Sequence, residues 1–139
     1  MRKLSREVLF KLIFAKNYGV KEDDSQNFDE LLNIIVQNEE IKPDDLDMDY
    51  LKQGFQNITD CFSKYVELIS QNVKKYKSSR IYNADIIILA IAIFEYNVLK
   101  LEKKIVISEA IKLAKKYSTE QSIKFINGVL SAVLKDENE

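Results

Sequence analysis

The sequence predicts an all-α protein. Apolar residues recur at the spacing of one helix face along most of the chain, as at Ile123, Ile126 and Leu130 near the C-terminus. The 139 residues include one proline and three glycines, too few for the many turns of an all-β fold. This length fits one domain, residues 1–139, that is large enough to bury a core.

The first two helices are expected on either side of a polar loop. Apolar residues surround nearly the whole circumference of residues 4–17, so this helix should be buried in its middle and end near Gly19. A second helix is expected over about residues 28–37. The segment 39–45 is predicted to be a break, because it contains the only proline, Pro43.

Helical patterning resumes near Leu46 and continues to about Tyr76. A helix of this length is unusual in a small domain, so we expect a break between Gly54 and Asp60. The next segment, residues 83–99, has an apolar centre that would also suit a buried strand. Because the chain offers no second strand to pair with it, we interpret it as a buried central helix.

Two shorter helices are expected at the C-terminal end. Ser108 is a good N-cap for a helix that ends by Tyr117, and residues 118–121 match a capping box that opens a helix to about Lys135. Asn127-Gly128 within that last helix is also a hairpin signal. Adjacent apolar pairs on both sides of it break the alternation of a strand and favour the helix.

Composition excludes several kinds of chemistry. The chain has no histidine and a single cysteine, Cys61, so it lacks the residues for a Ser-His-Asp triad, a histidine-bearing zinc site or an internal disulfide. Phosphate-cradling glycine loops are absent, and the longest apolar run, residues 86–94, is far shorter than a membrane span. We therefore expect a cytoplasmic protein without membrane association, catalytic activity, cofactor or metal.

Charge is distributed unevenly, although the formal net charge is −1. Residues 1–21 carry six Lys/Arg and one acid, residues 22–60 carry two Lys and twelve acids, and residues 61–116 carry eleven Lys/Arg and five acids. Local fields, rather than the net charge, decide whether an anionic partner can bind. We interpret the acidic block as solvated surface, whereas the basic cluster in residues 74–80 fits either solvated surface or a binding site.

The N-terminal helix indicates an anionic ligand. Arg2, Lys3 and Arg6 lie in or just before its first turn, where the helix dipole disfavours cations by about 0.3–1 kcal/mol each. A phosphate would be attracted both by these side chains and by the free N–H groups of that turn. The alternative is a solvated, frayed terminus. We favour RNA binding, in part because of a resemblance to a known family.

Three segments carry that resemblance. SEAIKLAKKY followed by KFINGVL is the most specific of them. Residues 85–99, DIIILAIAIFEYNVL, form a long apolar helix that ends in an aromatic-Glu pair, and a short basic lead runs into REVLFKLIF. Together they resemble the NusB family of bacterial transcription antitermination factors. The resemblance implies two small helical bundles packed together, in keeping with the seven or so helices expected here.

The resemblance also implies a function. NusB proteins bind the boxA sequence of nascent RNA jointly with NusE, a ribosomal protein, and help RNA polymerase to read through terminators, notably in ribosomal RNA operons. They do so without catalysis. By resemblance, the residues expected to contact RNA are Arg2, Lys3, Arg6, Gln121, Lys124 and Phe125. Those expected to contact NusE are Phe14 and Asp85. Core packing is an equally good interpretation of Phe125.

Two other functions stay open. The chain could be a helical protein–protein adaptor, or a homodimer, that buries the same basic surface without contacting RNA. It could also be an accessory RNA-binding subunit of an RNA-modifying enzyme whose catalytic domain belongs to a partner. RNA binding should weaken with salt, whereas self-association through an adaptor surface should not.

Overall fold

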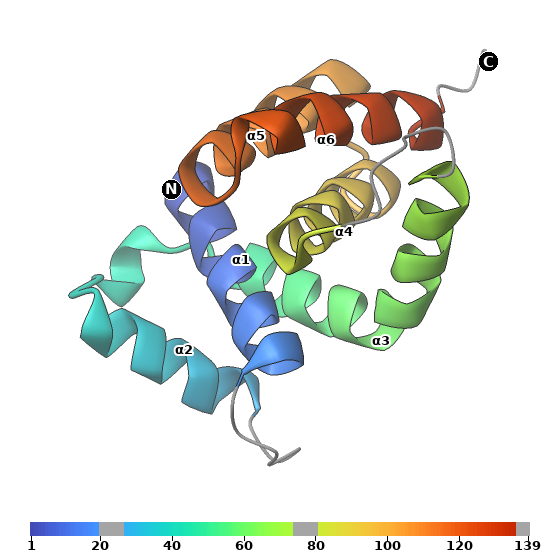
Figure 1. Ribbon diagram of the computed structural model, residues 1–139. Coiled ribbons are helices and arrows are strands. Elements are labelled where there is room, and N and C mark those ends of the chain that lie inside the picture. Colours follow the sequence, from blue (N-terminus) through green and yellow to red (C-terminus); the bar gives the residue numbers. More distant parts are fainter. Residues whose placement is uncertain (20–26, 74–80, 136–139) are drawn as a thin grey trace. The chain divides into compact units, whose positions relative to one another are not determined.

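The computed structural model describes residues 1–19, 27–73 and 81–135, which form six α-helices, one 3-10 turn and no strand (Figure 1). The all-α prediction is confirmed, and the helix count is close to the expected seven. The elements are α1 (Arg2–Tyr18), α2 (Phe28–Asn38), the 3-10 turn η1 (Pro43–Asp45), α3 (Met48–Val73), α4 (Asn83–Asn97), α5 (Lys103–Tyr117) and α6 (Glu120–Val133). None of the helices in these ranges is long and apolar enough to cross a membrane.

The chain divides into two compact units, Met1–Thr59 and Asp60–Glu139, and the division falls within α3. In the first unit α1 contacts α2. In the second unit α4, α5 and α6 all contact one another.

The core of the first unit is built on α1. Leu9, Leu12 and Ile13 have no exposed surface, as expected for a helix with apolar residues around its circumference. Phe28 at the start of α2 packs edge to face on Phe55 of α3, with 5.5 Å between the ring centroids. The first unit therefore joins its helices through a continuous apolar core.

The buried centre of the second unit is α4. Every residue from Ile87 to Phe94 is buried, which confirms the prediction of a central apolar helix. Both α5 and α6 run alongside it (Figure 1). Beyond the end of α6, the Lys135 carbonyl oxygen accepts a hydrogen bond of 2.5 Å from the Tyr96 hydroxyl of α4.

The expected break in the third helix is wrong, because α3 is continuous from Met48 to Val73. One face of the helix remains apolar through the region where the break was expected, so nothing in the packing forces the helix to stop. The glycine in that region, Gly54, costs only about 1 kcal/mol relative to alanine. The buried apolar side chains along α3 are Tyr50, Leu51, Phe55, Ile58, Tyr65 and Ile69.

The expected start of the next-to-last helix is also wrong. α5 begins at Lys103 rather than after Ser108, and Glu102 occupies its N-cap without a side-chain hydrogen bond. Its buried face already includes Val106. Packing against α4 and α6 therefore extends the helix toward its N-terminus, past Ser108, although Ser108 is the residue best suited to cap it.

The last helix begins one residue later than its sequence signal indicates. Thr119, not Ser118, is the N-cap of α6, and its Oγ1 accepts the Ser122 N–H at 3.1 Å. The predicted capping box needs Gln121 at the third helical position, which Ser122 occupies instead. The helix continues through Asn127-Gly128, as expected.

Asp47 holds the start of α3 and connects it to α1. Its Oδ1 accepts the Tyr50 N–H at 3.1 Å, and its own N–H donates to Ser5 Oγ at 2.8 Å. The hydrogen bond from the Tyr50 N–H, followed by the nearby Arg2 guanidinium, holds the pKa of the Asp47 carboxyl below its ordinary value of 3.8.

A proline in the middle of α3 should be strongly destabilising. Gln56 is exposed and lies where the break was expected. Because the helix is continuous there, Gln56→Pro removes a backbone hydrogen bond and should lower the free energy of unfolding by about 3 kcal/mol or more. Urea unfolding measures this, with Gln56→Ala as the control for the side chain. Equal stability of the two variants would show that the helix is interrupted.

Asp47→Asn should reduce stability only where the Asp47 carboxyl is charged. A lowered pKa in the folded chain means that the carboxyl contributes stability above pH 3.8, which is lost as the pH falls through the lowered value. At neutral pH the free energy of unfolding should fall by up to about 1 kcal/mol. Asparagine still caps the helix, so the wild type and the variant should converge in acid. Urea unfolding from pH 7 to pH 2 tests this, and a gap that persists at the lowest pH would contradict it.

Candidate nucleic-acid interface

The first turn of α1 presents two exposed cations, Arg2 and Lys3. The turn contains no acidic residue, and its N-cap, Met1, provides no side-chain hydrogen bond. The Ser5 N–H bonds to the Met1 carbonyl oxygen, and the N–H groups before it have no intrahelical acceptor. Cationic side chains and backbone donors therefore lie together at one helix start, a combination that attracts phosphate.

Arg2 is held in place without being withdrawn from solvent. Its Nη2 donates to Asp47 Oδ2 at 3.2 Å, and its Cζ lies 4.4 Å from the centroid of the Tyr50 ring. The Arg2 side chain is still 42% exposed. An ion pair this exposed contributes about 0–1 kcal/mol. Because a guanidinium carries five N–H donors, Arg2 can bind a phosphate with those that Asp47 does not use.

Arg6, the third cation predicted at this end of the helix, is only 5% exposed and takes part in an interaction of its own. It lies where the buried part of α1 begins, next to the buried Ser5. The RNA contact of Arg6 stays a prediction, and its burial does not favour it.

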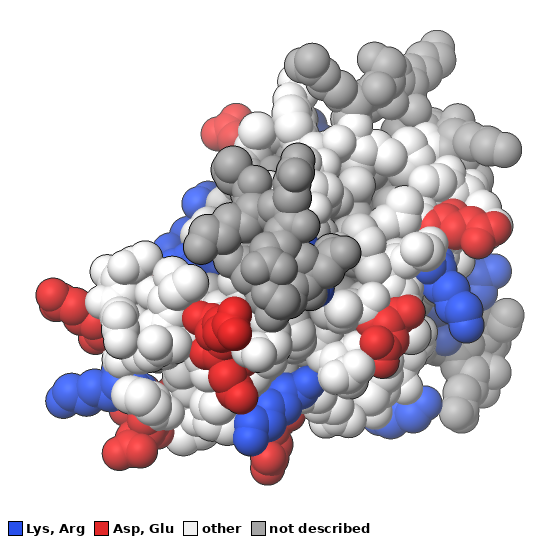
Figure 2. All heavy atoms as spheres, turned by 90° about the horizontal axis from the view of Figure 1, so that it is seen from below, with Lys and Arg blue, Asp and Glu red and all other residues white. Residues whose placement is uncertain are grey.

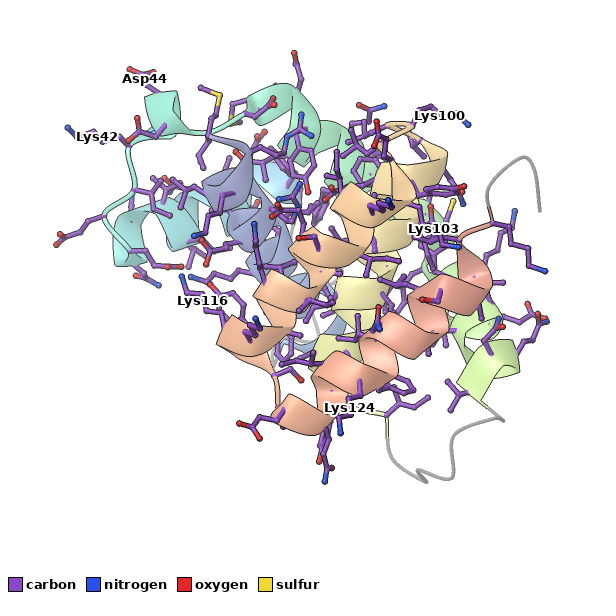
Figure 3. All side chains as sticks on the ribbon, turned by 90° about the horizontal axis from the view of Figure 1, so that it is seen from above. Lys42, Asp44, Lys100, Lys103, Lys116 and Lys124 are labelled. Atoms are coloured by element: carbon purple, nitrogen blue, oxygen red, sulfur yellow. The ribbon has the colours of Figure 1, made fainter. Side chains whose placement is uncertain are left out.

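The second predicted set of residues lies on the first two turns of α6. Gln121 and Lys124 are exposed, and Phe125 is half-buried. Side chains at positions i, i+3 and i+4 share one helix face, so all three are directed to the same side of α6. Figure 3 shows Lys124 near the start of this helix. These residues belong to the second unit and the α1 cations to the first.

Asp85, predicted to contact a protein partner, is only 2% exposed. Its Oδ1 accepts the hydroxyl of Ser118 at 2.5 Å, and its Oδ2 accepts the hydroxyl of Ser122 at 2.7 Å. The Asp85 carboxylate of α4 thus bonds both to Ser118, between α5 and α6, and to Ser122, in the first turn of α6. A direct partner contact stays a prediction, and in the chain alone both carboxylate oxygens already have donors.

Phe14 is the exposed member of an aromatic row on α1. It is 37% exposed, and its ring centroid lies 6.0 Å from that of Phe10 and 5.5 Å from that of Tyr18. Burial raises the pKa of the Tyr18 phenol. The row gives Phe14 a rigid apolar support, which is typical of aromatic residues that contact protein partners.

A basic stripe on α5 was not predicted from the sequence. Lys104, Lys112 and Lys115 line a shallow hollow of about 400 Å³ together with Ile107, Ser108 and Ile111. Their spacing along one helix face is visible in the sequence, but within the basic block 61–116 the cluster in residues 74–80 is the more conspicuous one. That cluster lies outside the described residues. Figure 2 shows basic and acidic side chains interspersed on one face of the molecule.

Metal chemistry has no visible site in the described residues. They contain no group of three or more histidine, cysteine, aspartate or glutamate side chains that could hold an ion. The start of α1 presents exposed cations, and the start of α6 presents a cation, an amide and an aromatic ring. Groups of these kinds suit a polyanion with unpaired bases.

Comparison with known proteins identifies the family. The model of the NusB family matches residues 1–135. The chain is 38% identical over 133 residues to the transcription antitermination protein NusB of Clostridium perfringens strain SM101, covering 95% of each protein. It is 33% identical over 135 residues to the protein of the same name from Clostridium botulinum strain Alaska E43, covering 96% of this chain and 98% of that one. The solved structure of T. maritima NusB matches with a TM-score of 0.76 at 27% identity, over 98% of this chain and 92% of that one. The chain belongs to the NusB family.

Proposed function

We propose that this chain is a transcription antitermination factor that binds boxA-type single-stranded RNA together with the ribosomal protein NusE. In this role it supports read-through by RNA polymerase, notably of ribosomal RNA operons, as part of an antitermination complex in the cytoplasm. The names of the Clostridium relatives, each a transcription antitermination protein, support the general function. The role requires neither catalysis nor a cofactor.

The start of α1 carries the RNA-binding part of the proposal. Arg2 and Lys3 are exposed cations in a turn without an acidic residue. In the isolated chain they face the unfavourable end of the helix dipole. A phosphate reverses this cost, because it accepts hydrogen bonds from the backbone N–H groups and pairs with both side chains.

The exposed face of α6 adds contacts that a phosphate alone would not need. Lys124 supplies a further cation, and the Gln121 amide can donate and accept hydrogen bonds at a base edge. Phe125 is half-buried, so it can both pack on the protein and stack on a base. Stacking on aromatic rings is the usual way in which proteins hold unpaired bases.

The proposed NusE contact rests on Phe14. An aromatic ring that is 37% exposed and supported on both sides by other rings offers apolar area at little entropic cost. Asp85 is part of the same proposal, but its buried carboxylate could affect a partner only through the helices it joins.

RNA binding should fall when the α1 cations are removed. A boxA-like single-stranded RNA is titrated across a salt series, with and without NusE, against the wild type and Arg2→Ala/Lys3→Ala. Loss of two phosphate contacts should weaken binding at low salt and reduce the slope of log K against log salt by about 1.4. NusE should strengthen binding by both proteins.

The matched control is Lys42→Ala/Lys52→Ala, which removes the same charge from exposed positions in the same unit (Lys42 is labelled in Figure 3). It should keep the wild-type salt slope. If the control weakens binding as much as the α1 variant, binding reflects net charge alone. If the wild type binds no RNA even with NusE, and sediments as a salt-insensitive dimer, the adaptor function replaces the proposed one.

Phe125→Leu should separate stacking from core packing. Leucine keeps most of the apolar volume, so the midpoint of thermal unfolding should change little. If Phe125 stacks on a base, RNA affinity should fall by about 1–3 kcal/mol. Unchanged affinity with a lower unfolding midpoint would assign Phe125 to the core.

A further inference from the structure

The carboxylate of Asp85 is enclosed by the hydroxyl groups that surround the start of α6. Ser118 precedes the helix and Ser122 lies in its first turn, and each donates to a different oxygen of Asp85, at 2.5 and 2.7 Å. Thr119 Oγ1 lies 2.9 Å from Ser122 Oγ and accepts the Ser122 N–H at 3.1 Å. Asp85 itself is in the first turn of α4. One buried group therefore joins the starts of two helices.

The hydrogen atoms of this cluster can be assigned so that each Asp85 oxygen has a donor, with the Ser118 hydroxyl shared between Asp85 Oδ1 and Ser122 Oγ, which lies 2.8 Å away. The Ser118 and Ser122 hydroxyls donate to Asp85, and the Thr119 hydroxyl donates to Ser122 Oγ. Both oxygens of Asp85 then accept one bond each. Removing the carboxyl group leaves two hydroxyls without their acceptor in a site that water does not enter freely, since Ser122 and Asp85 are each 2% exposed.

The rest of α6 is held by different forces. Ile126, Val129 and Leu130 are completely buried and lie beyond the first turn of the helix. Loss of Asp85 should therefore loosen the first turn of α6 while its later turns stay packed. Gln121 lies in that first turn, and Lys124 is one turn further along the same face.

We infer that Asp85 is a positioning residue for RNA binding, which fixes the first turn of α6 through Ser118 and Ser122 and thereby sets the direction of Gln121, Lys124 and Phe125. This inference rests on the proposed function. It replaces a surface contact of Asp85 with an action through the helix it holds, because the carboxylate is buried and its two oxygens already accept hydrogen bonds.

Asparagine offers a conservative replacement that distinguishes position from charge. Ser118 Oγ lies 2.8 Å from Ser122 Oγ. In Asp85→Asn the amide nitrogen can donate to Ser118, Ser118 can donate to Ser122, and Ser122 can donate to the amide oxygen. Only the bond between Ser118 and residue 85 reverses its direction, and the ring of hydrogen bonds closes without a charge. In Asp85→Ala it cannot close.

The experiment compares RNA affinity for the wild type, Asp85→Ala and Asp85→Asn, each with and without NusE. Asp85→Ala should bind RNA about tenfold more weakly, a mid-range coupling for residues that share a network, and Asp85→Asn should recover most of this loss. If both variants bind RNA more tightly, Asp85 acts by repelling phosphate. If both bind RNA normally but lose NusE, Asp85 is a partner contact. Either result overturns the inference.

Double-mutant cycles test the route through α6. The effect of Asp85→Ala should largely disappear in a Gln121→Ala/Lys124→Ala/Phe125→Ala background, because the residues it positions are gone. In an Arg2→Ala/Lys3→Ala background the effect should remain, since those cations lie on α1. Equal effects in both backgrounds would indicate a general loss of structure and would overturn the inference.

Ser118→Ala keeps the test decisive if Asp85→Ala does not fold. It removes one donor to Asp85 and leaves the Ser122 bond, so it should reduce RNA affinity by a smaller factor and lower the unfolding midpoint less than Asp85→Ala does. Amide hydrogen exchange of residues 119–122 should speed up in both variants, with no change in the second half of α6. Wild-type protein that binds no RNA refutes the proposed function, whereas RNA binding unaffected by Asp85→Ala and Ser118→Ala refutes only this inference.

Discussion

The burial of α4 is the constraint on which the second unit depends. Eight consecutive residues, Ile87 to Phe94, are hidden from solvent, and a helix that is apolar on all sides must be covered on all sides. Coverage by α5 and α6 meets part of this need. Because Asp85 lies in the first turn of α4, the same burial carries a carboxyl group into the core, where hydrogen bonds must satisfy it. The hydroxyl groups at the start of α6 do so.

Helical periodicity predicts the elements of this chain well, because burial of a helix face is recorded in a short stretch of residues. It placed α4 as a central helix and carried α6 through Asn127-Gly128. Periodicity failed to predict whether a long helix is divided, and which of two neighbouring polar residues caps a helix. The division of α3 was inferred from length alone, although its apolar face continues. Ser118 and Thr119 are chemically alike as caps, but in the folded chain Ser118 donates to Asp85 and Thr119 caps the helix.

The candidate interface was predictable in part. The exposed positions of Arg2, Lys3, Gln121 and Lys124 follow from local amphipathic pattern. The burial of Arg6 and Asp85 does not, since it depends on groups that pack from distant parts of the chain. The role of Asp47 was equally invisible, because its contacts with Ser5 and Arg2 join residues more than forty positions apart. Sequence patterns thus locate charges better than they locate the partners of those charges.

The hydrogen bond from Tyr96 to the Lys135 carbonyl oxygen and the cluster at Asp85 together determine how α6 lies along α4. The two residues of α4 bond to opposite ends of α6, so α6 is pinned to its neighbour at two places. A slide of α6 by one turn, about 5.4 Å along its axis, would break both attachments at once, whereas apolar packing alone would tolerate it better. The register of the two helices is therefore fixed by polar atoms at the ends, and the apolar contacts between them need only fill space.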